Sequence, residues 1–273
     1  MERRIVIDPS EKPSLLLREL WQYRELFYFL AWRNILVRYK QTVFGVAWSV
    51  IRPLMIMIVF TIIFGKIAKL PSGEVPYAVL VFVALLPWQF FSSTLSDSSN
   101  SLIGNAPLIS KVYFPRLILP SSAMMVSFID FVIAFAILIV LMIGYGIYPG
   151  WRLLAIPGLL VLCILISLGM GYFISALNVK YRDFKYIVPF SIQLGLYISP
   201  VGFNTSAVTD SWRLLYSVNP MVGVIDGFRW AILGDQSQLY LPGLIMSIGI
   251  GISLFVFGVR YFNKSERMFP DYI

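Results

Sequence analysis

Long apolar runs constrain this sequence more than any other feature. Five of them, residues 46–64, 75–91, 118–144, 153–177 and 241–261, each hold close to the roughly 20 apolar residues that cross the hydrocarbon core of a bilayer. A sixth run, 187–203, is shorter and is broken by Gly195 and Pro200. Only 13% of the 273 residues are charged, against about a quarter in soluble domains. The sequence therefore predicts an all-α integral membrane protein with six transmembrane helices.

The distribution of basic residues predicts the orientation of these helices. Lys and Arg are retained on the cytoplasmic side of short loops. With the N-terminus inside, 17 of the 22 basic residues are cytoplasmic and five are outside: Lys66, Lys69, Arg152, Arg213 and Arg229. We therefore expect both termini in the cytoplasm. The net charge of +8 is then mainly an orientation signal, with a contribution from anionic membrane lipid, and no nucleic-acid partner is expected.

The N-terminal region is expected to lie on the membrane rather than in it. Residues 1–40 are charged and mixed and contain no signal-peptide h-region. Within residues 14–42, apolar side chains at helical spacing alternate with charged ones, which predicts an amphipathic helix in the inner interface. They are Leu16, Leu17, Leu20, Tyr23, Leu26, Phe27 and Leu30. A cytosolic helix packed on another subunit remains an alternative.

Two cytoplasmic features are candidate contacts for a soluble partner. In residues 105–120, Pro107 is expected to start a short helix that Pro115 ends, with Lys111 and Arg116 beside it. One face of that helix would carry Leu108, Ile109, Val112 and Tyr113. The tight loop 178–186 holds further charged residues. An ordinary interfacial loop is the alternative for the first feature.

Two polar features interrupt the apolar pattern. The end of the second span, residues 92–101, is rich in Ser and cannot comfortably face lipid. It is expected to emerge from the membrane and line water, with packing on protein as the alternative. After Pro200 a semi-apolar segment of about forty residues is divided by Asn219-Pro220, which predicts two short helices re-entering the outer leaflet between spans five and six. Asp226 and Arg229 are spaced to pair on the second helix.

The chain lacks residues for most catalytic and metal chemistry. It has no His and a single cysteine, Cys163, so no zinc or haem site is expected. Gly65-Lys66 is followed by Ile67, and no phosphate-binding P-loop occurs elsewhere in the sequence. Intramembrane carboxylates are few, which gives little support to an ion-coupled carrier. If the protein transports something, its energy is expected to come from outside the chain.

Several short motifs follow one another along the chain. They are Arg38-Tyr39-Lys40-Gln41 running to Gly45, Trp48 and Pro53, Leu86-Pro87-Trp88-Gln89-Phe90-Phe91, Asn105 to Lys111, Phe114-Pro115 to Leu119-Pro120, Tyr181-Arg182-Asp183, Ser199-Pro200 and Asn219-Pro220 with Arg229. Their order and spacing resemble a known family, the membrane subunits of ABC-2 type ABC exporters, in particular those of O-antigen and teichoic-acid polysaccharides. The likeness covers residues 20–265. Arg52 departs from the small or amide residue expected before Pro53.

The resemblance implies a single transmembrane domain, 1–273, with a cytoplasmic and interface helix at 1–42 and the six-span region at 43–265. Such a subunit forms a homodimer in the bacterial cytoplasmic membrane. It recruits two copies of a cytosolic ATPase, which bind ATP and magnesium, and moves a lipid-linked glycan. No cofactor or catalytic residue is expected on this chain.

The resemblance also implies site residues. The ATPase-coupling residues would be Asn105, Pro107, Lys111, Tyr113, Phe114, Arg182 and Asp183. An outer gate would hold Pro200, Asn219, Pro220 and Arg229. Sugar faces stack on aromatic rings, so the candidates for the substrate path are Phe60, Phe64, Trp88, Phe90, Tyr197 and Phe203.

The sequence leaves two alternative functions open. The same architecture could export a drug or a small lipid. In a different class, the chain could be a membrane-embedded enzyme or assembly factor, with Asp130 and Asp97 as its acids.

Overall fold

The computed structural model describes residues 21–40, 45–70, 75–181 and 183–269, and every regular element in these ranges is helical. The N-terminal part of the expected interface helix, residues 14–20, and the predicted coupling residue Arg182 lie outside them. The elements are α2 (Arg24–Lys40), α3 (Gly45–Phe60), the π-helical η1 (Thr61–Ile67), α4 (Tyr77–Gly104), α5 (Ala106–Ile109), α6 (Ile118–Gly144), η2 (Trp151–Ala155), α7 (Ile156–Lys180), α8 (Phe184–Ile198), η3 (Thr205–Ala207), α9 (Asp210–Tyr216), α10 (Pro220–Leu233), η4 (Gly234–Gln236), α11 (Leu241–Ser265) and η5 (Glu266–Met268).

Five helical segments are long and apolar enough to cross a membrane, in agreement with the five longest apolar runs. They are Ala47–Ile67, Tyr77–Gly104, Ile118–Gly144, Trp151–Lys180 and Leu241–Ser265. The sixth run forms α8, whose 15 residues span about 22 Å, less than the roughly 30 Å of a hydrocarbon core. Gly195 does not interrupt this helix, contrary to expectation. The helix ends at Ile198, just before Ser199-Pro200, because the residue preceding a proline avoids the helical conformation.

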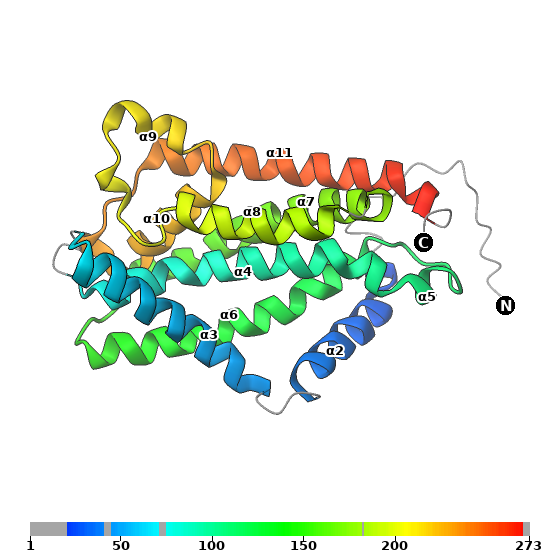
Figure 1. Ribbon diagram of the computed structural model, residues 1–273, viewed down its shortest axis with the longest axis horizontal. Helices are drawn as coiled ribbons and strands as arrows, with labels where there is room; N and C mark the ends of the chain where they lie inside the picture. Colours follow the sequence, from blue (N-terminus) through cyan, green and yellow to red (C-terminus); the bar gives the residue numbers. More distant parts are fainter. Residues whose placement is uncertain (1–20, 41–44, 71–74, 182, 270–273) are drawn as a thin grey trace.

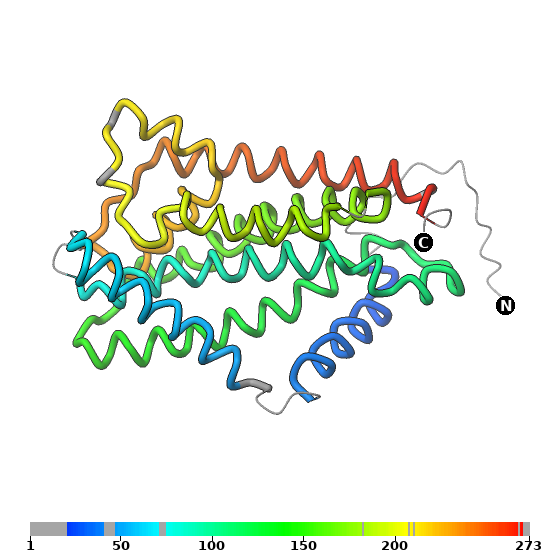
Figure 2. Tube along the Cα trace, viewed as in Figure 1, coloured from blue at the N-terminus to red at the C-terminus, as the bar shows by residue number. Residues whose placement is uncertain are grey.

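The helices form an elongated bundle with two distinct ends (Figure 1). One, here called the α5 end, holds α5, the start of α2 and the end of α11. The opposite end, called the α10 end, holds α9, α10 and the start of α4. The tube in Figure 2 shows the chain leaving α8 at the α10 end and turning through α9 into α10 before α11 returns along the bundle.

The central helix of the bundle is α4. Of its 18 most apolar consecutive residues 83% are buried, against 17% for the span that contains α3. It packs on α6, α7, α10, α3 and α8. Its serine-rich second half is mostly packed on protein. Ser98 Oγ donates to the carbonyl of Pro120 at 3.1 Å, and Asn178 Nδ2 donates to the carbonyl of Ser99 at 2.9 Å. The expectation that this stretch emerges and lines water holds only in part, since Ser92, Ser93 and Ser96 border a cavity.

Small residues allow α7 to approach its neighbours closely. A Cβ on Gly171 would lie 2.8 Å from the Cβ of Ser98 on α4. On the other side, a Cβ on Gly169 would lie 2.6 Å from the backbone nitrogen of Phe255, and one on Gly258 would overlap the carbonyl oxygen of Gly169. The series Ser167, Gly171, Ser175 is fully buried in this contact, so packing within the chain accounts for it.

Substituting Gly258 by alanine is expected to destabilise the protein by about 1–3 kcal/mol, because the added methyl overlaps backbone that cannot move aside cheaply. Gly249 on the same helix has no atom within 4 Å of an added Cβ, so Gly249→Ala is the matched control. Thermal unfolding of both variants in detergent provides the measurement. Equal melting temperatures for Gly258→Ala and Gly249→Ala would contradict the close α7–α11 contact.

Candidate functional site

The segment after α4 projects from the α5 end of the bundle (Figure 1). Its helix, α5, is a single turn over Ala106–Ile109 and ends well before Pro115, so the expected longer helix is wrong. Pro107, Lys111 and Tyr113 are exposed, and the Tyr113 side chain is 68% accessible. Ile109 and Phe114 point the other way and are buried. The four apolar residues expected on one face are therefore divided between the core and the surface.

Fixed contacts hold this projecting segment on both sides. Asn105 is the C-cap residue of α4, and its side chain accepts a hydrogen bond from Arg33 Nη2 of α2 while donating to the carbonyl of Ser101 at 2.7 Å. Phe114 lies in an apolar cluster with Leu30 of α2. Because the ends are anchored, the exposed residues between them are presented on a rigid base.

The turn between α7 and α8 lies at the same end, since α4 and α7 run in the same direction along the bundle (Figure 1). Asp183 is exposed and directly precedes α8. The Lys180 amine lies 5.1 Å from the centre of the Tyr181 ring. The described part of this turn therefore adds charged groups to the surface that carries Lys111 and Tyr113.

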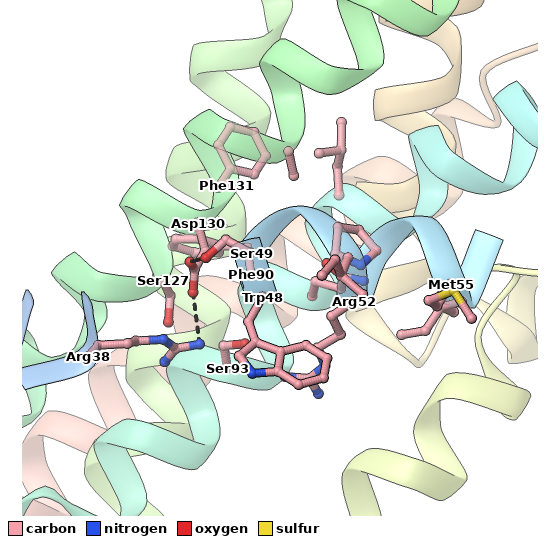
Figure 3. Close-up of a pocket in the computed structure, with 16 residues that line it drawn as sticks. Arg38, Trp48, Ser49, Arg52, Met55, Phe90, Ser93, Ser127, Asp130 and Phe131 are labelled. Atoms are coloured by element: carbon pink, nitrogen blue, oxygen red, sulfur yellow. Dashed lines mark hydrogen bonds and ion pairs between the residues drawn. The ribbon is translucent and has the colours of Figure 1, made fainter. Parts of the chain in front are cut away.

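A charged cluster joins α2 to α4 and α6, and Figure 3 shows its pair of Arg38 with Asp130. Arg38 of α2 lies 2.9 Å from an Asp130 oxygen on α6 and 3.2 Å from an Asp97 oxygen on α4. The other Asp130 oxygen accepts hydrogen bonds from Tyr39, at 2.6 Å, and from Ser49 of α3. Both oxygens of Asp130 are thus engaged. The sequence drew attention to Asp130 but contained no signal for its partners.

Tyr39 serves this cluster as a permanent donor. Burial, together with the hydrogen bond to Asp130, raises the pKa of Tyr39 to about 12. Its phenol therefore remains protonated at neutral pH and keeps donating to the carboxylate. With Asp130 held by three donors, its role is that of an ion-pair partner, which gives no support to the alternative of a membrane-embedded acid catalyst.

Two cavities flank α3 beside this cluster. The α6-side cavity, between α3, α4 and α6, has a volume of about 650 Å³. The α8-side cavity, between α3, α4 and α8, has a volume of about 390 Å³. Arg38, Arg52 and Gln89 border both. Figure 3 shows Arg38 and Asp130 together at one side of the α6-side cavity and Met55 at the other.

The six aromatic residues proposed for a substrate path fall into four places. Phe60 and Phe64 have ring centres 5.2 Å apart, and Tyr197 of α8 stacks on Phe60 at 6.5 Å. Phe90 lines the α6-side cavity and Trp88 the α8-side cavity. Phe203 packs on Tyr216 instead, with ring centres 6.4 Å apart. The structure brings the first three together and separates the others.

At the α10 end, buried polar groups hold the irregular segment 199–205. Arg229 is 1% exposed and donates to the carbonyls of Phe203 at 2.8 Å and Val201 at 3.1 Å. Asp226 accepts from the Thr205 hydroxyl. The expected ion pair between Asp226 and Arg229 is not formed among the described residues, because each side chain is bound by this segment. Unpaired backbone carbonyls inside a membrane are costly, and Arg229 satisfies two of them.

The Asn219-Pro220 pair starts α10 as expected. Asn219 Oδ1 accepts from the backbone N–H of Met221 at 3.1 Å, which caps the helix, and its Nδ2 donates to Ser199 Oγ at 2.9 Å. Pro220 occupies the first turn, where its missing N–H is not needed. Pro200 is buried beside them. All four residues proposed for the outer gate therefore lie at the α10 end.

Replacing Asp130 by alanine is expected to destabilise the protein by roughly 1–3 kcal/mol, because three donors lose their acceptor in a partly buried site. The control is Asp235→Ala, which breaks the Arg152–Asp235 pair, where the Asp235 side chain is 93% exposed. That change is expected to cost less than about 1 kcal/mol. Thermal unfolding measures both, and an equal loss in the two variants would refute a structural role for the cluster.

Comparison with known proteins places the chain in a family. Residues 25–233 match the ABC-2 type transporter family. The chain is 29% identical over 216 residues to the O-antigen export system permease protein RfbA of Myxococcus xanthus, which covers 78% of this chain and 82% of that protein. It is 28% identical over 247 residues to a protein of the same name from Klebsiella pneumoniae, covering 88% and 91%. Its long apolar helices make the chain a multi-pass membrane protein, consistent with the bacterial inner membrane. The chain belongs to the ABC-2 type transporter family.

Proposed function

We propose that this chain is the membrane subunit of an ATP-driven exporter that moves a lipid-linked polysaccharide, such as an O-antigen, across the bacterial cytoplasmic membrane. The observation that carries the proposal is the rigid, exposed surface at the α5 end, because the sequence contains no P-loop and the energy must enter through a contact. The names of the relatives support the choice of cargo.

The proposed topology has six spans with both termini in the cytoplasm. The excess of basic residues supports this orientation, which makes the α5 end cytoplasmic and the α10 end external. In this arrangement α8 is the fifth span. Its short length is completed by the buried residues Ser199, Pro200 and Val201. Helices α9 and α10 would form the re-entrant pair, and Arg229 would keep the outer gate closed against lipid.

The proposed assembly is a homodimer with two copies of a cytosolic ATPase. Lys111, Tyr113 and Asp183 would contact that ATPase, which would bind ATP and magnesium. Helix α2 is a second candidate contact because Tyr28, Phe29 and Trp32 are exposed. The same aromatic residues also suit the inner membrane interface. Phe60, Phe64 and Tyr197 are the best-placed aromatic residues for the glycan path, because they form one cluster.

Co-expression with a candidate cytosolic ATPase from the same genome tests the function. We expect the two proteins to co-purify and a deletion strain to lose surface glycan that the cloned gene restores. ATP turnover by this chain alone, or intact surface glycan in the deletion strain, would contradict the proposal.

Export of a drug or small lipid is a second candidate, because the α6-side cavity has the volume of a single small amphiphile rather than of a polymer. The same deletion strain separates the two candidates. Altered drug sensitivity with normal surface glycan would favour the second.

Alanine at Tyr113 is expected to uncouple the transporter: glycan export should fall at least about tenfold while ATP hydrolysis by the complex continues. The reason is that Tyr113 is exposed on an anchored segment, so its loss removes a contact without disturbing the core. Lys111→Ala should act in the same direction. Tyr148, 78% exposed in the turn between α6 and η2 at the opposite end, provides the control variant Tyr148→Ala. Wild-type export in the Tyr113 and Lys111 variants would remove the assignment.

A further inference from the structure

Hydrogen-bond donors without acceptors converge on the α6-side cavity. Arg52 forms neither an ion pair nor a hydrogen bond with any residue in the described part of the chain, and it lines the cavity from α3. Gln89 Nε2 is buried on α4 without an acceptor. The Ser127 hydroxyl on α6 is buried and equally unpaired, in a residue that is 1% exposed. Buried donors left unpaired destabilise a structure. Two of them beside an exposed arginine, all lining one cavity, indicate a ligand rich in acceptor oxygens.

The charge around this cavity favours an anion near Arg52. Asp130 is the one acidic residue in the lining, and both of its oxygens are engaged by Arg38, Tyr39 and Ser49. Asp97 lines only the α8-side cavity, where its negative charge would oppose an anion. Arg52 also interacts electrostatically with Asp97, but the one carboxylate that lines the α6-side cavity is already ion-paired with Arg38.

Most of the remaining lining is apolar. It includes Ile51, Met55, Ile56, Leu86, Phe90 and Phe131. Figure 3 shows Arg52 on the same helix as Met55, one turn apart, so polar and apolar parts of the lining adjoin along α3. A ligand that matches both parts carries an anionic head and a hydrocarbon chain.

We propose that the α6-side cavity binds the phosphate of a membrane lipid. Arg52 is the anion ligand, Gln89 and Ser127 donate to phosphate oxygens, and the apolar wall holds the adjoining chain. A guanidinium matches phosphate with two parallel hydrogen bonds, and a phosphate offers enough oxygens for the two neutral donors as well. This inference goes beyond the proposed function, because lipid binding here does not require export.

Native mass spectrometry of the full-length chain tests the proposal, with dioleoyl phosphatidic acid and dioleoylglycerol as probes that differ only by the phosphate. We expect Arg52→Gln to weaken phosphatidic acid binding about tenfold, as for loss of a charge-assisted hydrogen bond, and Arg52→Lys to weaken it less. Arg260→Gln, at an exposed position of α11 outside both cavities, removes the same charge and should leave binding unchanged. Equal affinity of the Arg52→Gln and Arg260→Gln variants, or equal binding of both probes to the wild type, would overturn the proposal.

Gln89→Leu separates a ligand role from a structural one. Removing an unpaired buried donor should raise the melting temperature of the lipid-free protein, while the same change weakens phosphatidic acid binding several-fold. A structural role for Gln89 predicts a lower melting temperature instead, and that result would count against the site.

The source of the phosphate is identified by competition between phosphatidylglycerol and a polyprenyl phosphate. Displacement by phosphatidylglycerol alone identifies a bilayer lipid, and displacement by the polyprenyl phosphate identifies a carrier lipid. If neither displaces phosphatidic acid, the site is wrong. Failure here leaves association with an ATPase untouched, so it is distinguishable from failure of the proposed function.

Discussion

The contacts of Arg38 with Asp130 and Asp97 determine much of the arrangement of this protein, because they join the peripheral helix α2 to α6 and α4. A charged side chain that is largely shielded from water costs free energy unless an opposite charge pairs with it. The pairing is reinforced by Tyr39 and Ser49, so α2 and the start of α3 are both fixed to α6. Once α2 is fixed, Arg33 reaches Asn105 and positions the segment that projects at the α5 end.

At the α10 end, buried side chains donate hydrogen bonds to backbone carbonyl groups instead of forming ion pairs. In the segment 199–205, the carbonyl groups of Val201, Gly202 and Phe203 accept no backbone hydrogen bond from the residues that the structure describes. Arg229 donates to two of these carbonyls and Tyr77 to a third, that of Gly202. A single buried cation thus satisfies two carbonyls of the irregular segment between α8 and α10. This explains why an arginine is tolerated at a position that is 1% exposed.

The sequence predicted the elements better than their contacts. Of the six predicted spans, the five longest apolar runs form helices long enough to cross a membrane, because length and hydropathy are local properties. Asn219-Pro220 indicated a helix start for the same reason. The partners of Arg38 lie 59 and 92 positions away along the chain, and no local pattern encodes such pairings. The expected Asp226–Arg229 pair was wrong because spacing on one helix ignores acceptors supplied by a neighbouring segment. The helix that Pro115 was expected to end was predicted too long, since it ends at Ile109.

Helix α2 links the projecting segment at the α5 end to the charged cluster around Asp130. Arg33 and Arg38 are five residues apart, so about 7.5 Å of helix separates the contact with the α5-end segment from the ion pairs beside the cavities. Two helices connect the projecting segment to the cavities: α2, through the contact of Arg33 with Asn105, and α4, which carries Gln89 and is capped by Asn105. That helix is packed on nearly all sides and resists displacement, whereas α2 buries only Leu30 and Ala31. Because close packing opposes motion and exposed surface permits it, movement of α2 requires less disruption than movement of α4. Any such movement changes the position of Arg38, which borders both cavities.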